Sequence, residues 1–381
     1  MMSEGWKTYK LSDLSERITS GGTPLTTRSE FYGGKIPWLK TQEINFNRVY
    51  DTETHITEDG LKNSSAKWIS ENSVIVAMYG ATAGKVALTK IPLTTNQACC
   101  NITVDPKLAD YNFIYYNLLS RYSEISRMST GAAQQNLNSG MLKDLLVTVP
   151  DLQEQSRIAS ILSSLDDKIE LNLQMNKTLE AIAQAIFKEW FVDFRFPGFD
   201  GELVDGLPKG WRNGHLVDIL DLRYGKALKS EERKEGKYPV VGSEGVVGTN
   251  NSYFVTGPGI VIGRKGTIGK VYWIEQNFYP IDTTFFIKDT IGVPSLYFHY
   301  FIVRDQDFQR ISSDSAVPGL NKNEALKNRV VVPDVQFVNL FNDLIKPLFD
   351  KIKVNSDNIT TLTSLRDSLL PKLINGKIRV S

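Results

Sequence analysis

The chain has 381 residues, of which 41% are hydrophobic and 23% charged, a composition typical of globular proteins and unlike that of disordered or fibrous ones. Its 44 Lys and Arg residues nearly balance its 43 Asp and Glu residues, so the net charge is +1 at pH 7. This balance excludes nucleic-acid binding through bulk charge alone but not through a local basic groove. At this length, two or three domains are expected.

The cysteines and the N-terminal segment indicate the compartment. The only cysteines, Cys99 and Cys100, are adjacent in sequence, which disfavours a disulfide and supplies at most half of a metal site. The N-terminus lacks a positively charged start followed by an apolar stretch, and no apolar run approaches the roughly 18 residues that cross a membrane. We therefore expect a cytoplasmic protein that is neither secreted nor embedded in a membrane.

The second half of the chain repeats the first. Residues 129–191 align with residues 312–374, and the alignment continues upstream with small insertions. The shared strings are Leu137–Asn138 with Leu320–Asn321, Pro150–Asp151 with Pro333–Asp334, Gly84–Val86 with Gly269–Val271, and Trp6 with Trp211. Two homologous halves therefore follow one another, which predicts an internal pseudo-two-fold repeat.

Each half begins with a strand-rich segment and ends with a helical one. The first kind is rich in Gly, Thr, Tyr and Val, with short apolar runs between turn residues, whereas the second contains almost no glycine. These shifts divide the chain into two mostly-β domains, residues 1–150 and 196–333, and two helical segments, residues 151–195 and 334–381. The predicted fold class is α+β.

Both helical segments carry a strict heptad repeat, with seams over residues 158–190 and 341–373. A repeat of 3.5 residues sustained over several heptads predicts two long helices in a coiled coil rather than helices lying on a sheet. The first segment is net negative and the second net positive, which favours their pairing with each other, as an antiparallel coiled coil. Asn172 and Asn355 occupy equivalent seam positions and either fix the register or face solvent on a kinked helix.

No catalytic signature emerges from the sequence. Gly80–Val86 resembles a phosphate-binding loop, but only three residues separate its glycines and Val86 stands where a Mg²⁺-binding Ser or Thr is needed. The three histidines are scattered, which leaves a catalytic triad or a zinc site unsupported. An enzyme with one carboxylate site in each half should repeat its acids, yet Glu43 and Glu71 have no clear counterparts. The protein therefore either does no chemistry or carries a chemistry that its sequence does not reveal, and no metal site is expected.

Several strings are informative as a set. They are Gly5–Leu14 with its echo at Gly210–Trp211, Ser20–Pro24, Ile36–Trp38, Gly80–Val86, Ile186–Phe194 and Leu369–Ile378. In this order, and over essentially the whole chain, the sequence resembles the specificity subunit of type I restriction-modification systems. The resemblance implies that residues 1–150 and 196–333 are target-recognition domains, each reading one half of a bipartite double-stranded DNA sequence. Residues 151–195 and 334–381 would then be helical spacers that dock two methyltransferase subunits.

The resemblance also implies that the chemistry belongs to partner subunits. Methylation of adenine would require S-adenosylmethionine on the methyltransferase, and cleavage would require ATP and Mg²⁺ on a restriction subunit. No cofactor is therefore expected in this chain, whose own role would be recognition of DNA for modification and restriction.

Helix length and the repeat fit a gapped target. Residues 158–190 would span about 50 Å at the α-helical rise, somewhat more than the roughly 34 Å of one DNA turn. Antiparallel helices would relate the two halves by an approximate two-fold axis, which matches the dyad of double-stranded DNA. Because the halves diverge over residues 22–74 and 225–259, we predict unlike half-sites and an asymmetric target.

The candidate DNA-binding residues lie in polar loops that the repeat places equivalently. Gln and Asn can bind adenine, Arg and Lys can bind guanine, and Glu and Asp can accept a hydrogen bond from cytosine, although each residue could instead be a solvated loop residue. In the first half they are Lys40, Thr41, Gln42, Tyr79, Thr82, Lys85, Asn96, Gln97, Gln134, Gln135 and Asn136. In the second half they are Ser243, Glu244, Arg264, Lys265, Thr267, Lys270, Asp282, Thr283, Asn321 and Lys322.

Two alternatives stay open. Trp190, Phe191 and Phe194 form either a methyltransferase docking surface or, as aromatic clusters more often do, a part of the core. The chain as a whole could be a non-catalytic scaffold with two β-rich ligand-binding domains on a coiled-coil rod. Such a scaffold would bind DNA weakly and without salt dependence.

Overall fold

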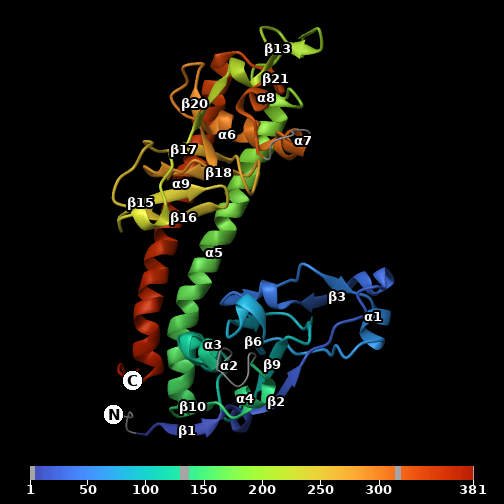
Figure 1. Ribbon diagram of the computed structural model, residues 1–381, viewed down its shortest axis with the longest axis vertical. Helices are drawn as coiled ribbons and strands as arrows, with labels where there is room; N and C mark the ends of the chain where they lie inside the picture. Colours follow the sequence, from blue (N-terminus) through green and yellow to red (C-terminus); the bar gives the residue numbers. More distant parts are fainter. Residues whose placement is uncertain (1–4, 129–136, 314–318, 381) are drawn as a thin grey trace. The chain divides into compact units, whose positions relative to one another are not determined.

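The computed structural model describes residues 5–128, 137–313 and 319–380. The chain divides into two compact units, called unit 1 (residues 1–171 and 359–381) and unit 2 (residues 172–358), and both units are visible in Figure 1. Each unit contains part of both long helices, α5 (Leu152–Phe191) and α9 (Val335–Ile374). No helix within the described residues is long and apolar enough to cross a membrane.

A five-stranded sheet forms the centre of unit 1, in the order β2-β9-β6-β7-β4, and it is antiparallel except for β4 beside β7. A three-stranded sheet, β5-β3-β8, and a two-stranded ribbon, β1-β10, accompany it. The strands are β1 (Lys7–Lys10), β2 (Ser15–Ser20), β3 (Tyr32–Leu39), β4 (Asn47–Val49), β5 (His55–Ile56), β6 (Val74–Ala77), β7 (Val86–Thr89), β8 (Thr94–Thr95), β9 (Cys99–Val104) and β10 (Leu146–Val149). The short helices are α1 (Glu58–Lys62), α2 (Tyr111–Ser120), α3 (Tyr122–Met128) and α4 (Ser139–Lys143).

The central strands of unit 1 are apolar without alternation because both of their faces are covered. On β6, Val74 and Val76 pack in one cluster with Phe113 of α2, whereas Ile75 packs with Leu39 of β3 in another. The side-chain period of two along a strand sends these neighbours to opposite faces. Figure 1 shows α2 and α3 between this sheet and the first half of α5.

In unit 1 the start of α5 packs against the end of α9. Leu162 of α5 and Leu373 of α9 lie in the same buried cluster. Asp166 of α5 accepts hydrogen bonds from Arg366 of α9 at 2.7 Å and from the hydroxyl of Tyr116 at 2.6 Å. The two helices therefore run antiparallel within this unit.

Unit 2 repeats this plan. Its main sheet has the order β14-β20-β17-β18, its small sheet the order β16-β15-β19, and its ribbon consists of β13 and β21. The strands are β11 (Leu203–Val204), β12 (Leu207–Pro208), β13 (Arg212–His215), β14 (Leu220–Tyr224), β15 (Tyr238–Gly242), β16 (Gly245–Asn250), β17 (Gly259–Gly263), β18 (Val271–Ile274), β19 (Tyr279–Pro280), β20 (Thr284–Asp289) and β21 (Arg329–Val332). The short helices are α6 (Tyr297–Arg304), α7 (Phe308–Ser313) and α8 (Lys322–Leu326). Among the described residues of this unit, the main sheet has no counterpart of β4.

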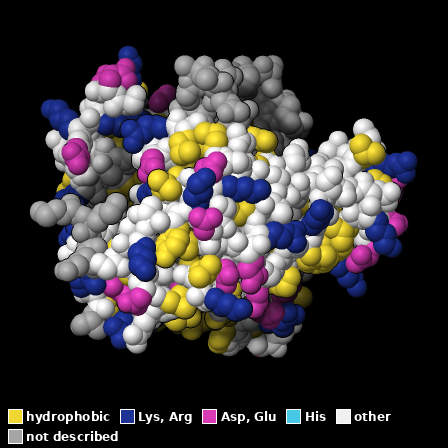
Figure 2. All heavy atoms as spheres, turned by 90° about the horizontal axis from the view of Figure 1, so that it is seen from below, with side chains coloured by type: hydrophobic (Ala, Val, Ile, Leu, Met, Phe, Trp, Pro, Cys, Tyr) yellow, Lys and Arg dark blue, Asp and Glu magenta, His cyan; other side chains and the backbone are white. Residues whose placement is uncertain are grey.

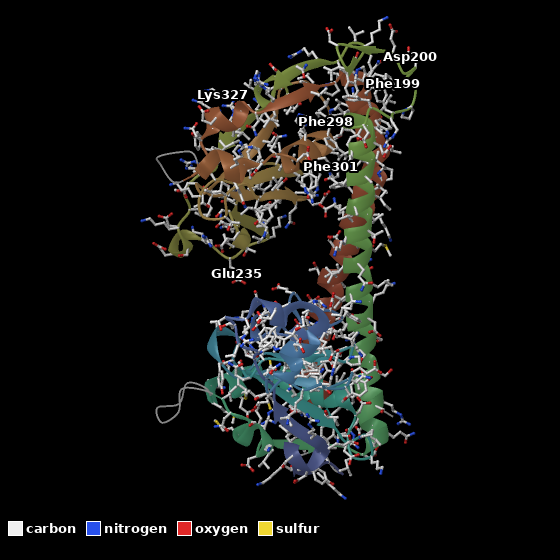
Figure 3. All side chains as sticks on the ribbon, turned by 90° about the vertical axis from the view of Figure 1, so that its right-hand side faces the viewer. Phe199, Asp200, Glu235, Phe298, Phe301 and Lys327 are labelled. Atoms are coloured by element: carbon white, nitrogen blue, oxygen red, sulfur yellow. The ribbon has the colours of Figure 1, made fainter. Side chains whose placement is uncertain are left out.

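An aromatic cluster joins the end of α5, the start of α9 and α6 in the core of unit 2. The ring of Phe191 lies 4.8 Å from that of Phe298 and 5.2 Å from that of Phe341. Figure 3 shows Phe298 and Phe301 on the side of unit 2 that meets the long helices. Trp190 and Phe191 are buried, and the half-buried Phe194 packs against Trp211. These aromatic residues therefore belong to the core, as the second of the two alternatives held.

The predicted heptad seam is confirmed position by position. Every seam residue of α5 from 158 to 190 and of α9 from 341 to 373 is buried or half-buried. Asn172 and Asn355 are only 3% and 1% exposed, so neither faces solvent. In unit 2, Asn355 Nδ2 donates a hydrogen bond to Asn176 Oδ1 at 2.9 Å, which places a polar contact inside the seam. Such a contact favours one register, because a shifted register would break the hydrogen bond between Asn355 and Asn176.

Candidate nucleic-acid interface

Three of the predicted loops of unit 1 meet at one edge of its sheets: residues 40–42, 79–85 and 96–97. The amide of Asn96 donates to the carbonyl of Leu39 at 3.0 Å, which joins the turn after β8 to the end of β3. The amide of Met78 donates to the carbonyl of Ala98 at 2.8 Å, which joins the same turn to the end of β6. The candidates that are far apart in sequence are thus neighbours in space.

The side chains at this edge differ in their exposure and in the contacts that they already make. Tyr79 is 40% exposed, and Gln42 and Gln97 are also exposed. Lys85 is half-buried, and its Nζ donates to Asn45 Oδ1 at 2.8 Å and lies 5.8 Å from the ring of Phe46.

Other candidates of unit 1 hold the loops together. Thr41 is buried, and the half-buried Thr82 closes its own turn through the carbonyl of Tyr79 at 3.5 Å. Lys40 is half-buried, with its backbone amide bonded to a carboxylate oxygen of Glu43 at 3.1 Å. Asn96 Oδ1 accepts from the amide of Ala98 at 3.2 Å. Gln134, Gln135 and Asn136 lie outside the described residues.

The loops of unit 2 meet in the same way: residues 224–226, 243–244, 264–270, 282–283 and 320–322. The amide of Arg264 donates to the carbonyl of Thr283 at 2.9 Å, and the amide of Leu320 donates to the carbonyl of Arg264 at 2.8 Å. The hydroxyl of Tyr272 donates to the carbonyl of Ser243 at 3.1 Å, which ties the loop after β15 to β18.

Arg264 is held at this edge by two aromatic rings and a backbone carbonyl. Its guanidinium carbon lies 5.1 Å from the ring centroid of Tyr224 and 5.7 Å from that of Phe285, and Nη1 donates to the carbonyl of Asp282 at 3.3 Å. Lys265 and Lys270 are exposed, and neither forms an ion pair with a residue that the structure describes. Glu244 and Asp282 are exposed beside them, and Thr267 and Thr283 are half-buried. The edge therefore mixes donors and acceptors.

Two candidates of unit 2 have structural roles instead. Asn321 caps α8, because its Oδ1 accepts from the amides of Asn323 at 2.9 Å and Glu324 at 3.3 Å. Asn138 caps α4 in the same manner, so the repeat of this asparagine reflects helix capping. Lys322 pairs with Asp221 at 2.7 Å. Burial opposes ionisation of Asp221, but the hydrogen bond and charge of Lys322 outweigh it and hold the pKa of this carboxyl below its ordinary value.

The sequence analysis missed several residues at these edges. In unit 2, Tyr224 is 53% exposed and Lys226 is exposed, and both flank Gly225 at the end of β14. A Cβ added at Gly225 would overlap the carbonyl of Ile281, so only glycine permits this close approach. In unit 1, Asn45 and Phe46 were also missed. For Tyr224 and Lys226 the available signal was the family-like Ser20–Pro24 string, because Gly21 follows β2 as Gly225 follows β14, and a Cβ added at Gly21 would likewise overlap a carbonyl, that of Thr95.

Charges elsewhere on the surface are mixed. On the face seen in Figure 2, Lys and Arg side chains alternate with Asp and Glu side chains and with apolar ones. Figure 3 labels Glu235 and Lys327, two exposed residues on the outside of unit 2. Within the part of the chain that the structure describes, no three His, Cys, Asp or Glu residues gather in a way that could hold a metal ion. Burial raises the pKa of the Cys100 thiol to about 12, so this cysteine stays protonated.

Comparison with known proteins decides the family. The family model described as the type I restriction modification DNA specificity domain matches residues 3–181 and again residues 208–350. The chain belongs to this family. As a specificity subunit it is a recognition component and not an enzyme, and the double match agrees with the internal repeat.

The similarity extends over whole proteins. The type I restriction enzyme MjaIX specificity subunit of Methanocaldococcus jannaschii is 28% identical, over 98% of this chain and 94% of that protein. The HindI specificity subunit of Haemophilus influenzae is 24% identical, over 98% of this chain and 99% of that protein. The crystal structure of a type I S subunit from M. genitalium shares the fold, with a TM-score of 0.61 and 22% identity over 97% of this chain and 96% of that one.

Proposed function

We propose that this specificity subunit reads a bipartite, gapped and asymmetric double-stranded DNA target. Residues 1–150 and 196–333 are the two target-recognition domains of the proposal, and each reads one half-site with the sheet edge described above. The observation that carries the proposal is that both units present equivalent edges on equivalent scaffolds, with unlike side chains on the loops.

The differences between the edges support unlike half-sites. Unit 1 offers Tyr79 and Gln97, whereas unit 2 offers Arg264 and Asp282. Glutamine matches adenine, arginine matches guanine and a carboxylate matches cytosine in the major groove. Two copies of one scaffold with different loops would therefore select different bases, and the complete target would not be a palindrome.

The long helices are the proposed spacers, over residues 151–195 and 334–381, and the proposed docking site of two methyltransferase subunits. Exposed apolar side chains on these helices support docking. They are Leu152, Leu171, Leu173, Ile182, Val335, Leu340, Leu344, Val354 and Leu365. In this proposal S-adenosylmethionine is bound by the methyltransferases, and ATP and Mg²⁺ by restriction subunits where these join. The complex would act in the cytoplasm, where the DNA is.

Exchange of one recognition domain tests the proposal. Residues 1–150 are replaced by the corresponding segment of a related specificity subunit, and the methylated motif is determined for the complex with its methyltransferase. One half of the motif should change while the other half and its orientation persist. A change in both halves, or in neither, would refute the assignment of one half-site to each domain.

A further inference from the structure

The loop between β17 and β18 in unit 2 has a counterpart between β6 and β7 in unit 1. Gly80 and Gly266 both have positive φ angles, of 72° and 74°, and so do Gly84 and Gly269, at 84° and 78°. These pairs align the loops, and the alignment places Arg264 opposite Met78. The backbone hydrogen bonds support this alignment. The amide of Arg264 donates to the turn before β20, and the amide of Met78 donates to the turn before β9, as described above.

At this position the two units carry side chains of different chemistry. Met78 is 2% exposed and packs in the core of unit 1, so it offers nothing to a ligand. Arg264 is half-buried and its guanidinium lies against two rings. One hydrogen bond, to the carbonyl of Asp282, uses one of its five N–H donors. No carboxylate among the described residues forms an ion pair with it.

A guanidinium held in this way can donate two hydrogen bonds to a pair of acceptor atoms that lie in one plane. The contacts with the rings of Tyr224 and Phe285 and the hydrogen bond to Asp282 hold the group in place, which lowers the conformational entropy that it loses on binding. Two ligands present a matching pair of acceptors on DNA: a phosphate group, and the O6 and N7 atoms of guanine in the major groove. Comparison of the two halves of the chain separates phosphate from guanine as the ligand of Arg264.

Phosphates occur at every half-site, whereas a given base does not. A residue that binds phosphate is therefore useful in both recognition domains, and a base-reading residue in only one. Lys85 and Lys270 follow the first pattern, because both are lysines at the same position beside Gly84 and Gly269. Arg264 follows the second pattern, because its counterpart is a buried methionine.

We propose that Arg264 reads a guanine in the half-site of the second recognition domain, whereas Lys270, like Lys85, contacts the phosphate backbone. This inference rests on the proposed function and names the base that one residue selects. It predicts a G·C pair at a defined position of the second half-site.

The test uses the specificity subunit assembled with its methyltransferase. The target is first obtained from the methylated motif, and methylation rates are then measured on duplexes in which each base pair of the second half-site is changed in turn. The variants are Arg264→Ala and Arg264→Gln, with Lys270→Ala as the matched control, since it removes a cation from the same loop.

Arg264→Ala should abolish discrimination at one G·C position, by about ten- to a hundredfold, and leave the other positions unchanged. Arg264→Gln should move the preference at that position toward adenine, which a misfolded variant cannot imitate. Lys270→Ala should weaken binding to all sequences alike and lower the salt slope by about one, without changing the motif.

Two results would overturn the inference. One is an Arg264→Ala variant that weakens all targets equally and lowers the salt slope, which is the behaviour of a phosphate contact. The other is a second half-site made only of A·T pairs. Failure of the proposed function has a different signature, because the unaltered complex would then show no sequence preference at all.

Discussion

Removal of the Phe191 side chain separates a core role from a docking role at the end of α5. This ring contacts the rings of Trp211 at 5.6 Å, Phe298 at 4.8 Å and Phe341 at 5.2 Å, and the residue is buried. Truncation of a buried phenylalanine to alanine costs about 3–5 kcal/mol, because the neighbouring rings cannot close the cavity. A domain of this size loses roughly 2–4 °C in Tm for each kcal/mol, so we expect the Tm of unit 2 to fall by about 6–20 °C.

The assay is differential scanning calorimetry of Phe191→Ala beside Val192→Ala. Val192 is the next residue and is 48% exposed, so its truncation should change stability by less than about 0.5 kcal/mol. Affinity for the methyltransferase is measured on the same proteins below their unfolding temperatures. An unchanged Tm together with lost methyltransferase binding for Phe191→Ala would refute the assignment of this cluster to the core.

Three further predictions concern single side chains. Asp166→Asn should destabilise unit 1 by about 1.5–3 kcal/mol in urea unfolding, since it weakens a charged hydrogen bond to Arg366, and an unchanged midpoint would contradict this role. Burial disfavours ionised Asp289, but the hydrogen bond from His299 and those from backbone amides outweigh it, so the pKa of Asp289 lies below its ordinary value. The stability advantage of the unaltered protein over Asp289→Asn should therefore be complete above about pH 3.9 and disappear as the pH falls through the depressed native pKa; an advantage that grows on acidification would contradict the sign. Lys85→Ala should lower the slope of log affinity against log salt by about 0.9 without altering the methylated motif, and a changed motif would show that Lys85 reads a base.

The helical half of the fold was predictable because its signal is local. Heptad spacing depends only on residues within one segment, and it identified the long helices and every seam position. The burial of Asn172 and Asn355 could not be predicted from the sequence of either helix alone, since the sequence does not distinguish a buried asparagine from an exposed one until the partner helix is known. Asn355 has its hydrogen-bond partner in Asn176 of the other long helix, which the sequence of one helix alone does not reveal.

The candidate site was only partly predictable, because similar residues serve different purposes. Asn321 looked like a base-reading amide and is a helix cap, and Lys322 looked like a free cation and is paired with Asp221. A repeated residue is expected for either purpose, so the repeat alone cannot separate capping from recognition.

The surroundings of Arg264 could not be predicted from the sequence either. The two rings that its guanidinium contacts come from β14 and β20, which are distant from Arg264 in the chain and become its neighbours only through strand pairing. Long-range pairing of this kind leaves no pattern within a short stretch of sequence.

In the proposed function, this chain chooses the DNA sequence that its methyltransferase modifies. The decisive measurement is long-read sequencing of methylated adenines in a recombinant host that carries the methyltransferase with or without this chain. The positive control is the specificity subunit of a relative, combined with the same methyltransferase. Methylation in that control shows that the methyltransferase is active. We expect one gapped, asymmetric motif that is methylated only when this chain is present. Methylation at the same sites without the chain, or no methylated motif with the chain while the relative supports methylation, would show that this chain does not choose the target.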